Sequence, residues 1–358
     1  MMYASPTVIN SEYSEFNLKK LRLNTRFQNI IYYCVSDLVN DTFNFLDDVA
    51  DGSMVVMWNP EETGYWHQHW ITRLNDKLKN KKFEFVYLTG AGPNNNISEF
   101  FDIKFNFRHL TVFDSRVVDV WNNQDGIDDP IGPVAVSVHK YKKFTFLNEE
   151  DAVHQRYVLS RLAQSGLLDQ GVVSFQLTND VDIFSKSNDL SEKHGFTPAG
   201  IDYVKDQCTN LPKLPIEVSG VLKRSTHHNT YVSVVAETFL TYSSQPFKQT
   251  FVTEKIFNSI ACNQIFFIVG QPHSLKLLKD MGYQTFASII DEGYDNIESH
   301  QERLFAVTRE IVKFLKRPED EITADYEKII PIIEHNRDLL FKQTLKHKMQ
   351  TFFNEHYA

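Results

Sequence analysis

An acid and a base stand side by side at Glu254-Lys255, in FVTEKIFNSIACNQIFFIVG (251–270), where a helical pattern runs straight into an apolar strand. If Thr253 caps that helix, its first turn presents unbonded backbone N–H groups and a partial positive charge. Such a helix end binds anions, and the ammonium of Lys255 would add a full charge. On spacing alone, the pair is also consistent with a cap or a solvated surface ion pair.

Further polar groups are expected close to this pair. Glu237 stands in SVVAETF, where an apolar strand is about to leave its sheet, and the polar loop TYSSQPFKQT (241–250) follows it. Arg156 lies on a predicted helix after the first strand of the second half. Ligands of parallel sheets bind beyond the carboxyl ends of the strands, where these groups should converge. Carboxylates accept hydrogen bonds from hydroxyls and cations neutralise phosphates, so the set suits a sugar joined to a diphosphate.

The first half offers three carboxylates that directly follow predicted strands. Glu61 and Glu62 stand in WNPEETGYW, and Asp114 stands in VFDSR. Each is a candidate general base, a group that takes a proton from an attacking hydroxyl. Glu62 is the first choice, because its turn is short and is surrounded by aromatic residues that could stack on a sugar or a base. Alternatively, Glu61 and Glu62 simply favour the N-terminus of the next helix.

Strands and helices alternate along the chain, which is typical of parallel sheets with crossover helices. A passage rich in Asn, Asp, Gly and Pro near 122–143 separates two such series. We therefore predict an α/β protein of two Rossmann-like domains, residues 1–140 and 141–358, with the chemistry in the cleft between them. A final helix containing Pro331 either completes the second domain or packs back on the first. Strands are predicted at 53–59, 82–92, 108–115, 142–148, 172–177, 230–240 and 283–288, and helices at 64–80, 96–105, 151–166, 273–281 and 299–317.

Composition narrows the class of protein. The 358 residues carry a net charge of −9, which disfavours a general nucleic-acid binder, although the basic stretch NLKKLRLNTR (17–26) could contact phosphates locally. The three cysteines, Cys34, Cys208 and Cys262, are widely spaced, which argues against a zinc site and favours a reducing compartment. With no membrane-length apolar run and no recognisable secretory signal, we expect a cytoplasmic protein (host cytoplasm if viral) without membrane partner or metal.

Four stretches resemble a known family: KKFTFLN…HQRYVLSRLAQSGLLDQGVVSF, YVSVVAETF, FVTEKIFNSIACNQIFFIVGQPHSLKLLKDMGYQTF and DEGYDNIE. They are similar to the donor-binding half of α-1,3-fucosyltransferase-like glycosyltransferases, and most of all to divergent bacterial and phage relatives. The resemblance covers residues 142–300. It implies a GT-B fold, with an acceptor-binding first domain and a nucleotide-sugar-binding second domain facing across a cleft. The first half matches no motif, so the acceptor stays open.

The resemblance also implies roles for particular residues. Lys255 and Arg156 would bind the donor diphosphate, Glu254 would hold ribose or sugar hydroxyls, and Glu237 would line the donor site beside Thr253. No metal or other cofactor is obligatory in this family. The chain departs from it at NEED (148–151), where relatives often carry a basic NRR-like run.

The first hypothesis is an inverting, metal-independent glycosyltransferase that moves a sugar from a nucleotide-sugar donor to a hydroxyl of a carbohydrate acceptor. The second is a phage DNA-modifying arabinosyl- or glucosyltransferase acting on 5-hydroxymethylated bases. The third is a non-catalytic sugar- or nucleotide-binding module. A Rossmann-type oxidoreductase is disfavoured, because TGAGPNN (89–95) lacks the glycine spacing of a dinucleotide-binding turn.

Overall fold

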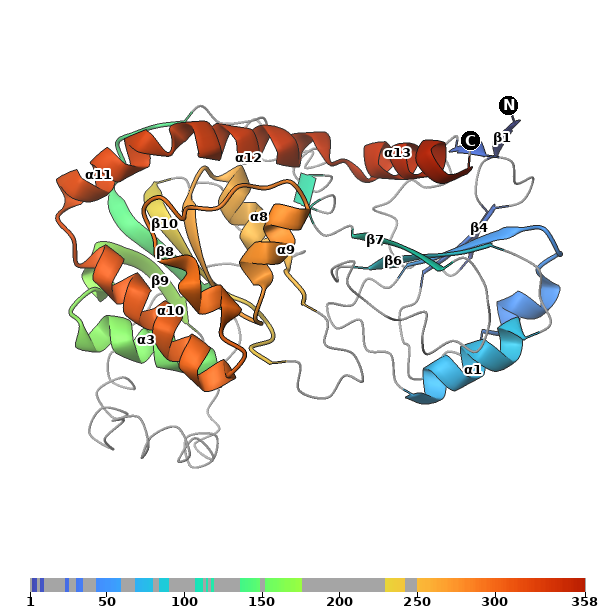
Figure 1. Ribbon diagram of the computed structural model, residues 1–358, viewed down its shortest axis with the longest axis horizontal. Helices are drawn as coiled ribbons and strands as arrows, with labels where there is room; N and C mark the ends of the chain where they lie inside the picture. Colours follow the sequence, from blue (N-terminus) through green and yellow to red (C-terminus); the bar gives the residue numbers. More distant parts are fainter. Residues whose placement is uncertain are drawn as a thin grey trace. The chain divides into compact units, whose positions relative to one another are not determined.

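The protein is described by a computed structural model, in which the chain forms two compact units (Figure 1). Unit 1 comprises Met1–Gly132, Tyr242–Thr253 and Leu340–Ala358, and unit 2 comprises Pro133–Thr241 and Glu254–Leu339. The structure describes residues 2–4, 7–9, 23–25, 30–34, 43–58, 68–79, 84–89, 107–111, 114, 117–118, 136–148, 152–175, 229–241 and 250–357.

Unit 1 contains a five-stranded parallel sheet in the order β2-β4-β5-β6-β7. Its strands are β2 (Thr7–Ile9), β4 (Ile30–Cys34), β5 (Met54–Trp58), β6 (Glu84–Thr89) and β7 (Phe107–Thr111). The unit also contains the antiparallel pair β1 (Met2–Ala4) and β3 (Leu23–Thr25), the short η2 (Asn44–Asp48), α1 (Gln68–Leu78) and α13 (Leu345–Tyr357), which packs against β3. The three strands predicted here are confirmed as β5, β6 and β7. The helix predicted at 96–105 lies outside the described residues.

Unit 2 contains a four-stranded parallel sheet in the order β11-β10-β8-β9. Its strands are β8 (Lys142–Asn148), β9 (Gly171–Phe175), β10 (Thr230–Ala236) and β11 (Ile265–Val269). The helical elements are α3 (Val153–Gln164), η4 (Leu168–Gln170), α8 (Glu254–Ala261), α9 (Ser274–Asp280), η5 (Glu292–Asn296), α10 (His300–Leu315), α11 (Glu319–Lys328) and α12 (Ile330–Lys342). The sheets and helices together make a mixed α/β fold compatible with a Rossmann-like architecture.

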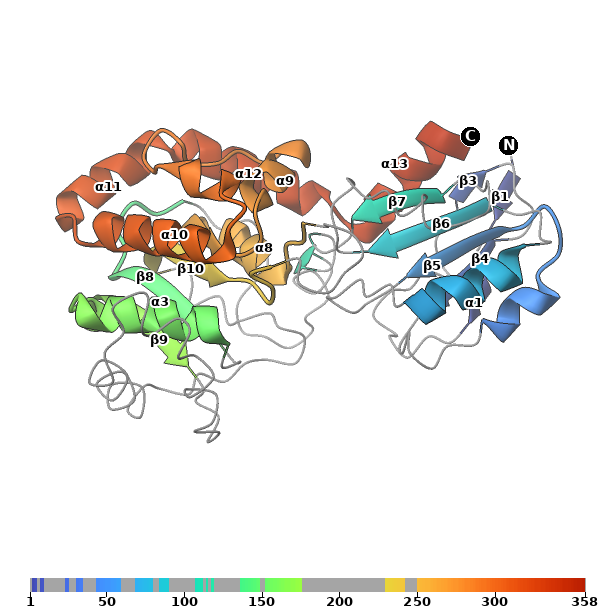
Figure 2. The same ribbon diagram turned by 60° about the horizontal axis from the view of Figure 1, so that its bottom comes forward.

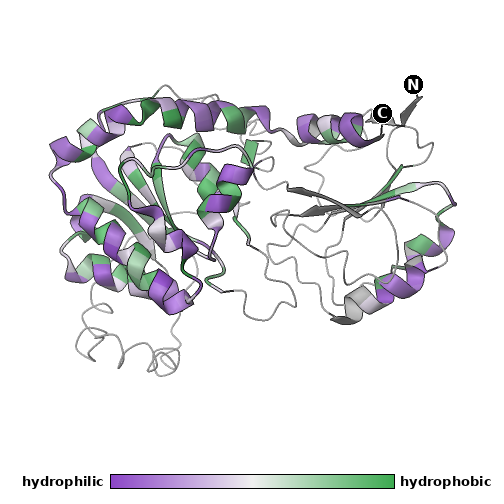
Figure 3. Ribbon diagram, viewed as in Figure 1, coloured by the Kyte–Doolittle hydropathy of each residue, from purple (hydrophilic) through white to green (hydrophobic). Residues whose placement is uncertain are grey.

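Helices cover both faces of the unit 2 sheet. Ser233 of β10 accepts a hydrogen bond of 2.8 Å from Ser259 of α8, and its register partner Phe266 shares that face. Phe267, the next residue of β11, points to the opposite face and packs edge-on against Phe314 of α10. The helix α3 contacts α10 and so lies on this second face (Figure 2). In Figure 3 the strands between these layers are mostly hydrophobic, as burial on both faces requires.

Two sequence predictions for the last third of the chain are wrong. The segment 283–288 is not a strand, because its backbone finds other partners: the amide of Gln284 donates to Oδ1 of Asn336 on α12 (2.7 Å), and its carbonyl accepts from Nδ2 of Asn336 (2.8 Å). The predicted final helix is three helices, α11, α12 and α13. Pro331 does not break one, because it stands in the first turn of α12, where a missing N–H costs no helical hydrogen bond.

Candidate functional site

The order of the described strands reverses at one place, between β8 and β10 in unit 2. The chain forms β8, adds β9 on one side of it, and then adds β10 and β11 on the other side. Such a reversal is a topological switch point, where the loops after neighbouring strands diverge and leave room for a ligand at the carboxyl ends. The described strands of unit 1 follow one another in order and contain no such point. The candidate site is therefore the carboxyl edge of the unit 2 sheet.

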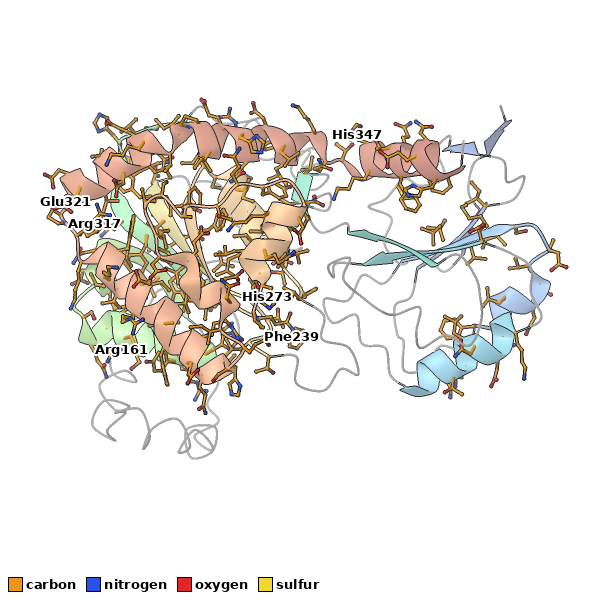
Figure 4. The ribbon with its side chains drawn as sticks, in the orientation of Figure 1. Arg161, Phe239, His273, Arg317, Glu321 and His347 are labelled. Atoms are coloured by element: carbon orange, nitrogen blue, oxygen red, sulfur yellow. The ribbon has the colours of Figure 1, made fainter. Side chains whose placement is uncertain are left out.

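Two helices begin at this edge and bond to the end of β10. His154, in the first turn of α3, contacts the backbone carbonyl oxygen of Glu237 through Nε2 at 2.8 Å. Lys255, in the first turn of α8, donates from Nζ to Oγ1 of Thr238 at 3.2 Å. The two residues after β10 thus connect the N-termini of both crossover helices. Phe239 and His273, labelled in Figure 4, follow β10 and β11 and mark the same edge.

His154 is neutral at this edge. Burial lowers the pKa of its imidazole from the ordinary 6.5 to about 4, the hydrogen bond to Glu237 opposes the change, and the charge of Lys255 adds to it. A carbonyl oxygen only accepts, so Nε2 carries the proton and Nδ1 keeps its lone pair. Because His154 and Lys255 bond to the consecutive residues Glu237 and Thr238, the first turns of α3 and α8 lie close together.

Glu237 is fully buried directly after β10, where its amide donates to the carbonyl of Val269 (3.0 Å). Its side chain passes close to Gly270: a Cβ added at Gly270 would lie 3.2 Å from both Cβ and Cγ of Glu237. The glycine that follows β11 therefore leaves the room that the buried glutamate occupies. The sequence predicted the strand-end position of Glu237, but not this contact.

Arg303 of α10 binds backbone carbonyls at the same edge, and the sequence analysis did not identify it. Its guanidinium is buried and donates to the carbonyls of Gly270 (2.9 Å) and Leu240, which follow β11 and β10. It also donates to Ile297 (2.6 Å) and Glu298 (3.2 Å). A signal was present in the sequence, because Arg303 shares the buried face of α10 with Val307 and Phe314 at helical spacing.

The N-terminus of α9 is occupied by a side chain of the protein itself. Asp295 accepts from the backbone N–H groups of Leu275 (3.0 Å) and Lys276 (3.1 Å). Burial raises the pKa of Asp295, and these two hydrogen bonds lower it in part. Asp295 belongs to DEGYDNIE, one of the stretches that carried the family resemblance, and here it caps a helix.

The remaining predicted donor-binding residues occupy the two helix starts. Arg156 is 8% exposed in the first turn of α3, and Glu254, the first residue of α8, is 7% exposed. Thr253, the residue before α8, is fully buried. The structure thus joins Lys255 to Thr238, the residue that follows Glu237. It places Arg156 and Glu254 on the same two first turns.

The predicted catalytic residues belong to unit 1. Glu61 and Glu62 lie outside the described residues. Asp114, which follows β7, is 1% exposed, and both its carboxylate oxygens lie 2.6 Å from Nζ of Lys348 on α13. An acceptor hydroxyl would have to compete with Lys348 for Asp114.

Within the described parts of the chain, no three His, Cys, Asp or Glu side chains gather as metal ligands would. Nor does any helix there combine the length and apolar character needed to cross a membrane. No protein-family model, curated protein or solved structure matches the chain.

Proposed function

We propose that the protein is a GT-B glycosyltransferase that transfers a sugar from a nucleotide-sugar donor to an acceptor hydroxyl, with inversion and without a metal. The observation that carries the proposal is the convergence of the N-termini of α3 and α8 on the end of β10, at the switch point of a parallel sheet. Helix N-termini stabilise anions, and Lys255 adds a cation there. This is what a donor diphosphate needs as it becomes the leaving group.

Each named residue has a part in the proposed transfer. Lys255 and Arg156 bind the diphosphate, and Glu254 and Glu237 accept hydrogen bonds from ribose or sugar hydroxyls. The acceptor oxygen bonds to the anomeric carbon as the bond from that carbon to the diphosphate oxygen breaks, and the hydroxyl proton passes to a carboxylate of the first domain. Glu62 is the first candidate for that base, followed by Glu61. Asp114 ranks below them because Lys348 engages both its oxygens.

Thermal unfolding with UDP-, GDP-, ADP- and CMP-sugars tests the donor site. A ligand at about 100 times its Kd stabilises the folded protein by about 2.7 kcal/mol, which gives a measurable rise in Tm. We expect one nucleotide class to raise the Tm of the wild type and to fail with Lys255→Ala. The matched control is Lys313→Ala, which removes an exposed lysine of α10 and should keep the full response. If no nucleotide stabilises the wild type, the proposal is wrong.

The acceptor requires a separate assay with the donor identified in this way. Transfer is measured to carbohydrates and, in parallel, to DNA containing 5-hydroxymethylcytosine at low and high salt. Transfer to DNA that declines steeply with salt would identify the DNA-modifying alternative, since phosphate contacts release counterions. Nucleotide binding without transfer to either, unchanged by Glu62→Gln and Asp114→Asn, would identify a binding module.

A further inference from the structure

A buried amide at the candidate edge has no partner among the described residues. Asn148 is the last residue of β8, the strand beside the switch point, and is 4% exposed. Neither Nδ2 nor Oδ1 makes a hydrogen bond there. A buried polar group without a hydrogen bond lowers the stability of the folded protein by about 1–3 kcal/mol, and Asn148 has two such groups. Such a group is expected where a ligand will satisfy it.

The register shows which way Asn148 faces. Thr145 pairs with Ser233, whose side chain meets α8, so Thr145 lies on the α8 face of the sheet. Side chains alternate along a strand, and Asn148 therefore lies on the other face, with α3 and α10. The first turn of α3 reaches this edge, where His154 bonds to Glu237. Asn148 thus lies on the face of the sheet that α3 covers, at the edge that the first turn of α3 reaches.

Among the residues that the structure describes, no side chain caps that helix start. Its N-cap residue is Ala152, which has no side-chain acceptor, and Gln155 reaches back only to the backbone N–H of Ala152 (3.2 Å). The N-terminus of this 12-residue helix and the amide of Asn148 therefore present donors and one acceptor at the same edge.

The chemistry of the amide selects among the parts of a nucleotide sugar. The diphosphate of a nucleotide sugar is esterified at both ends and carries no proton at neutral pH, so its oxygens accept hydrogen bonds but cannot donate to Oδ1 of Asn148. A sugar hydroxyl both donates and accepts, so hydroxyls satisfy both ends of the amide. We propose that Asn148 is a specificity residue that binds hydroxyls of the donor, either of its ribose or of the transferred sugar. This inference rests on the proposed function. Because the amide is nearly enclosed, the ligand must open the edge slightly to reach it.

The test compares the wild type with Asn148→Leu, which keeps the branched shape and removes both polar atoms. Calorimetric titrations use the nucleotide sugar found by thermal shift, its free nucleoside diphosphate, and inorganic diphosphate. We expect Asn148→Leu to weaken nucleotide-sugar binding about tenfold or more, as loss of hydrogen bonds to a buried amide implies. Binding of inorganic diphosphate should not change, since it has neither ribose nor sugar hydroxyls. If Asn148→Leu also weakens binding of the free nucleoside diphosphate, Asn148 contacts the ribose. If it weakens binding of the nucleotide sugar alone, Asn148 contacts the transferred sugar.

Stability gives an independent readout. Removal of two unsatisfied polar atoms should leave the Tm of the unliganded protein unchanged or raise it by about 2 °C or more. Ser160→Ala is the matched control, because Ser160 is also buried and its hydroxyl makes no hydrogen bond within the described residues. Ser160 lies seven residues after Val153, the first residue of α3, which is about 10 Å along the helix axis from the candidate edge. It should leave binding unchanged. Asn148→Ala repeats the titrations in case leucine is too large.

Several results would overturn the inference. These are unchanged nucleotide-sugar binding in both Asn148 variants, an equal loss of inorganic diphosphate binding, or a fall in the unliganded Tm of Asn148→Leu without a binding defect. The last would show that water or the protein itself satisfies the amide. If the wild type binds no nucleotide, the proposed function fails and this inference with it. If the wild type binds and the variants bind equally well, the inference alone fails.

Discussion

The imidazole of His154 donates a hydrogen bond of 2.8 Å to the backbone carbonyl of Glu237, and so ties the first turn of α3 to the end of β10. The two residues are 83 positions apart in the chain. The bond forms at the switch point of the sheet, where Lys255 of α8 binds the next residue, Thr238. Four predictions follow from this edge and from the ion pair of unit 1.

Stability should fall as the pH is lowered, because of His154. Its pKa is about 4 in the folded protein, against 6.5 as the ordinary value, so the unfolded chain binds the proton more tightly. The contribution of His154 to the free energy of unfolding is therefore fully present above pH 6.5. It is lost as the pH falls towards 4, and the loss amounts to at most about 3 kcal/mol. Denaturant unfolding between pH 4 and 7.5 measures it. His154→Gln should reduce this slope, whereas His139→Gln, at an exposed position, should not. An unchanged slope in His154→Gln would contradict the prediction.

Arg303→Lys should destabilise unit 2 by about 2 kcal/mol or more. The planar guanidinium reaches carbonyls after both β10 and β11, a geometry that a single ammonium cannot reproduce. Because these carbonyls belong to the candidate edge, nucleotide binding should weaken as well. Chemical denaturation and the thermal-shift assay measure the two effects. Arg309→Lys, exposed on the same helix, serves as the control, and equal behaviour of the two variants would refute the role of Arg303.

Gly270→Ala should weaken nucleotide binding. The added methyl would lie 3.2 Å from two side-chain carbons of Glu237, so this buried residue must shift, at a cost of about 1–2 kcal/mol. Gly171→Ala is a useful contrast: its methyl would meet the ring of Phe144 at 2.4 Å, at the opposite end of the sheet. It should lower the Tm more but leave the Kd of the remaining folded protein unchanged. Equal Kd values for Gly270→Ala and the wild type would contradict the prediction.

Asp114 and Lys348 should show strong coupling in a double-mutant cycle. Both oxygens of the buried carboxylate bond to the ammonium, so Lys348→Met leaves a buried charge unpaired and should cost about 3 kcal/mol. The double variant Asp114→Asn/Lys348→Met should be less destabilised than the sum of the single variants, as denaturant titrations will show. The exposed pair Lys313–Glu310 should couple by less than about 1 kcal/mol. Additive effects at Asp114 and Lys348 would show that the ion pair contributes little.

Local pattern determined much of the fold. The apolar runs predicted β5, β6, β8 and β9, and the strand at 142–148 was placed to the residue. The residues Ser299 and Glu302 have the spacing of a capping box, and Ser299 is the N-cap of α10, where it accepts from the amide of Glu302. These features depend on residues a few positions apart, whose propensities and spacing are visible in the sequence. The carboxyl-edge positions of Glu237 and Lys255 follow from the same reading.

Tertiary structure decided what depends on residues far apart in the chain. The segment 283–288 has strand-like composition, yet Asn336, 52 positions away, takes the backbone bonds of Gln284. Asn148 was predicted as the last residue of a strand, but only the order of β8 and β10 placed it beside the switch point. The spacing of Arg303 on α10 indicates a buried position, but not its partner Leu240, which lies 63 positions away in the chain. Each outcome is set by which buried donors and acceptors meet in space, and periodicity along one segment carries no information about that.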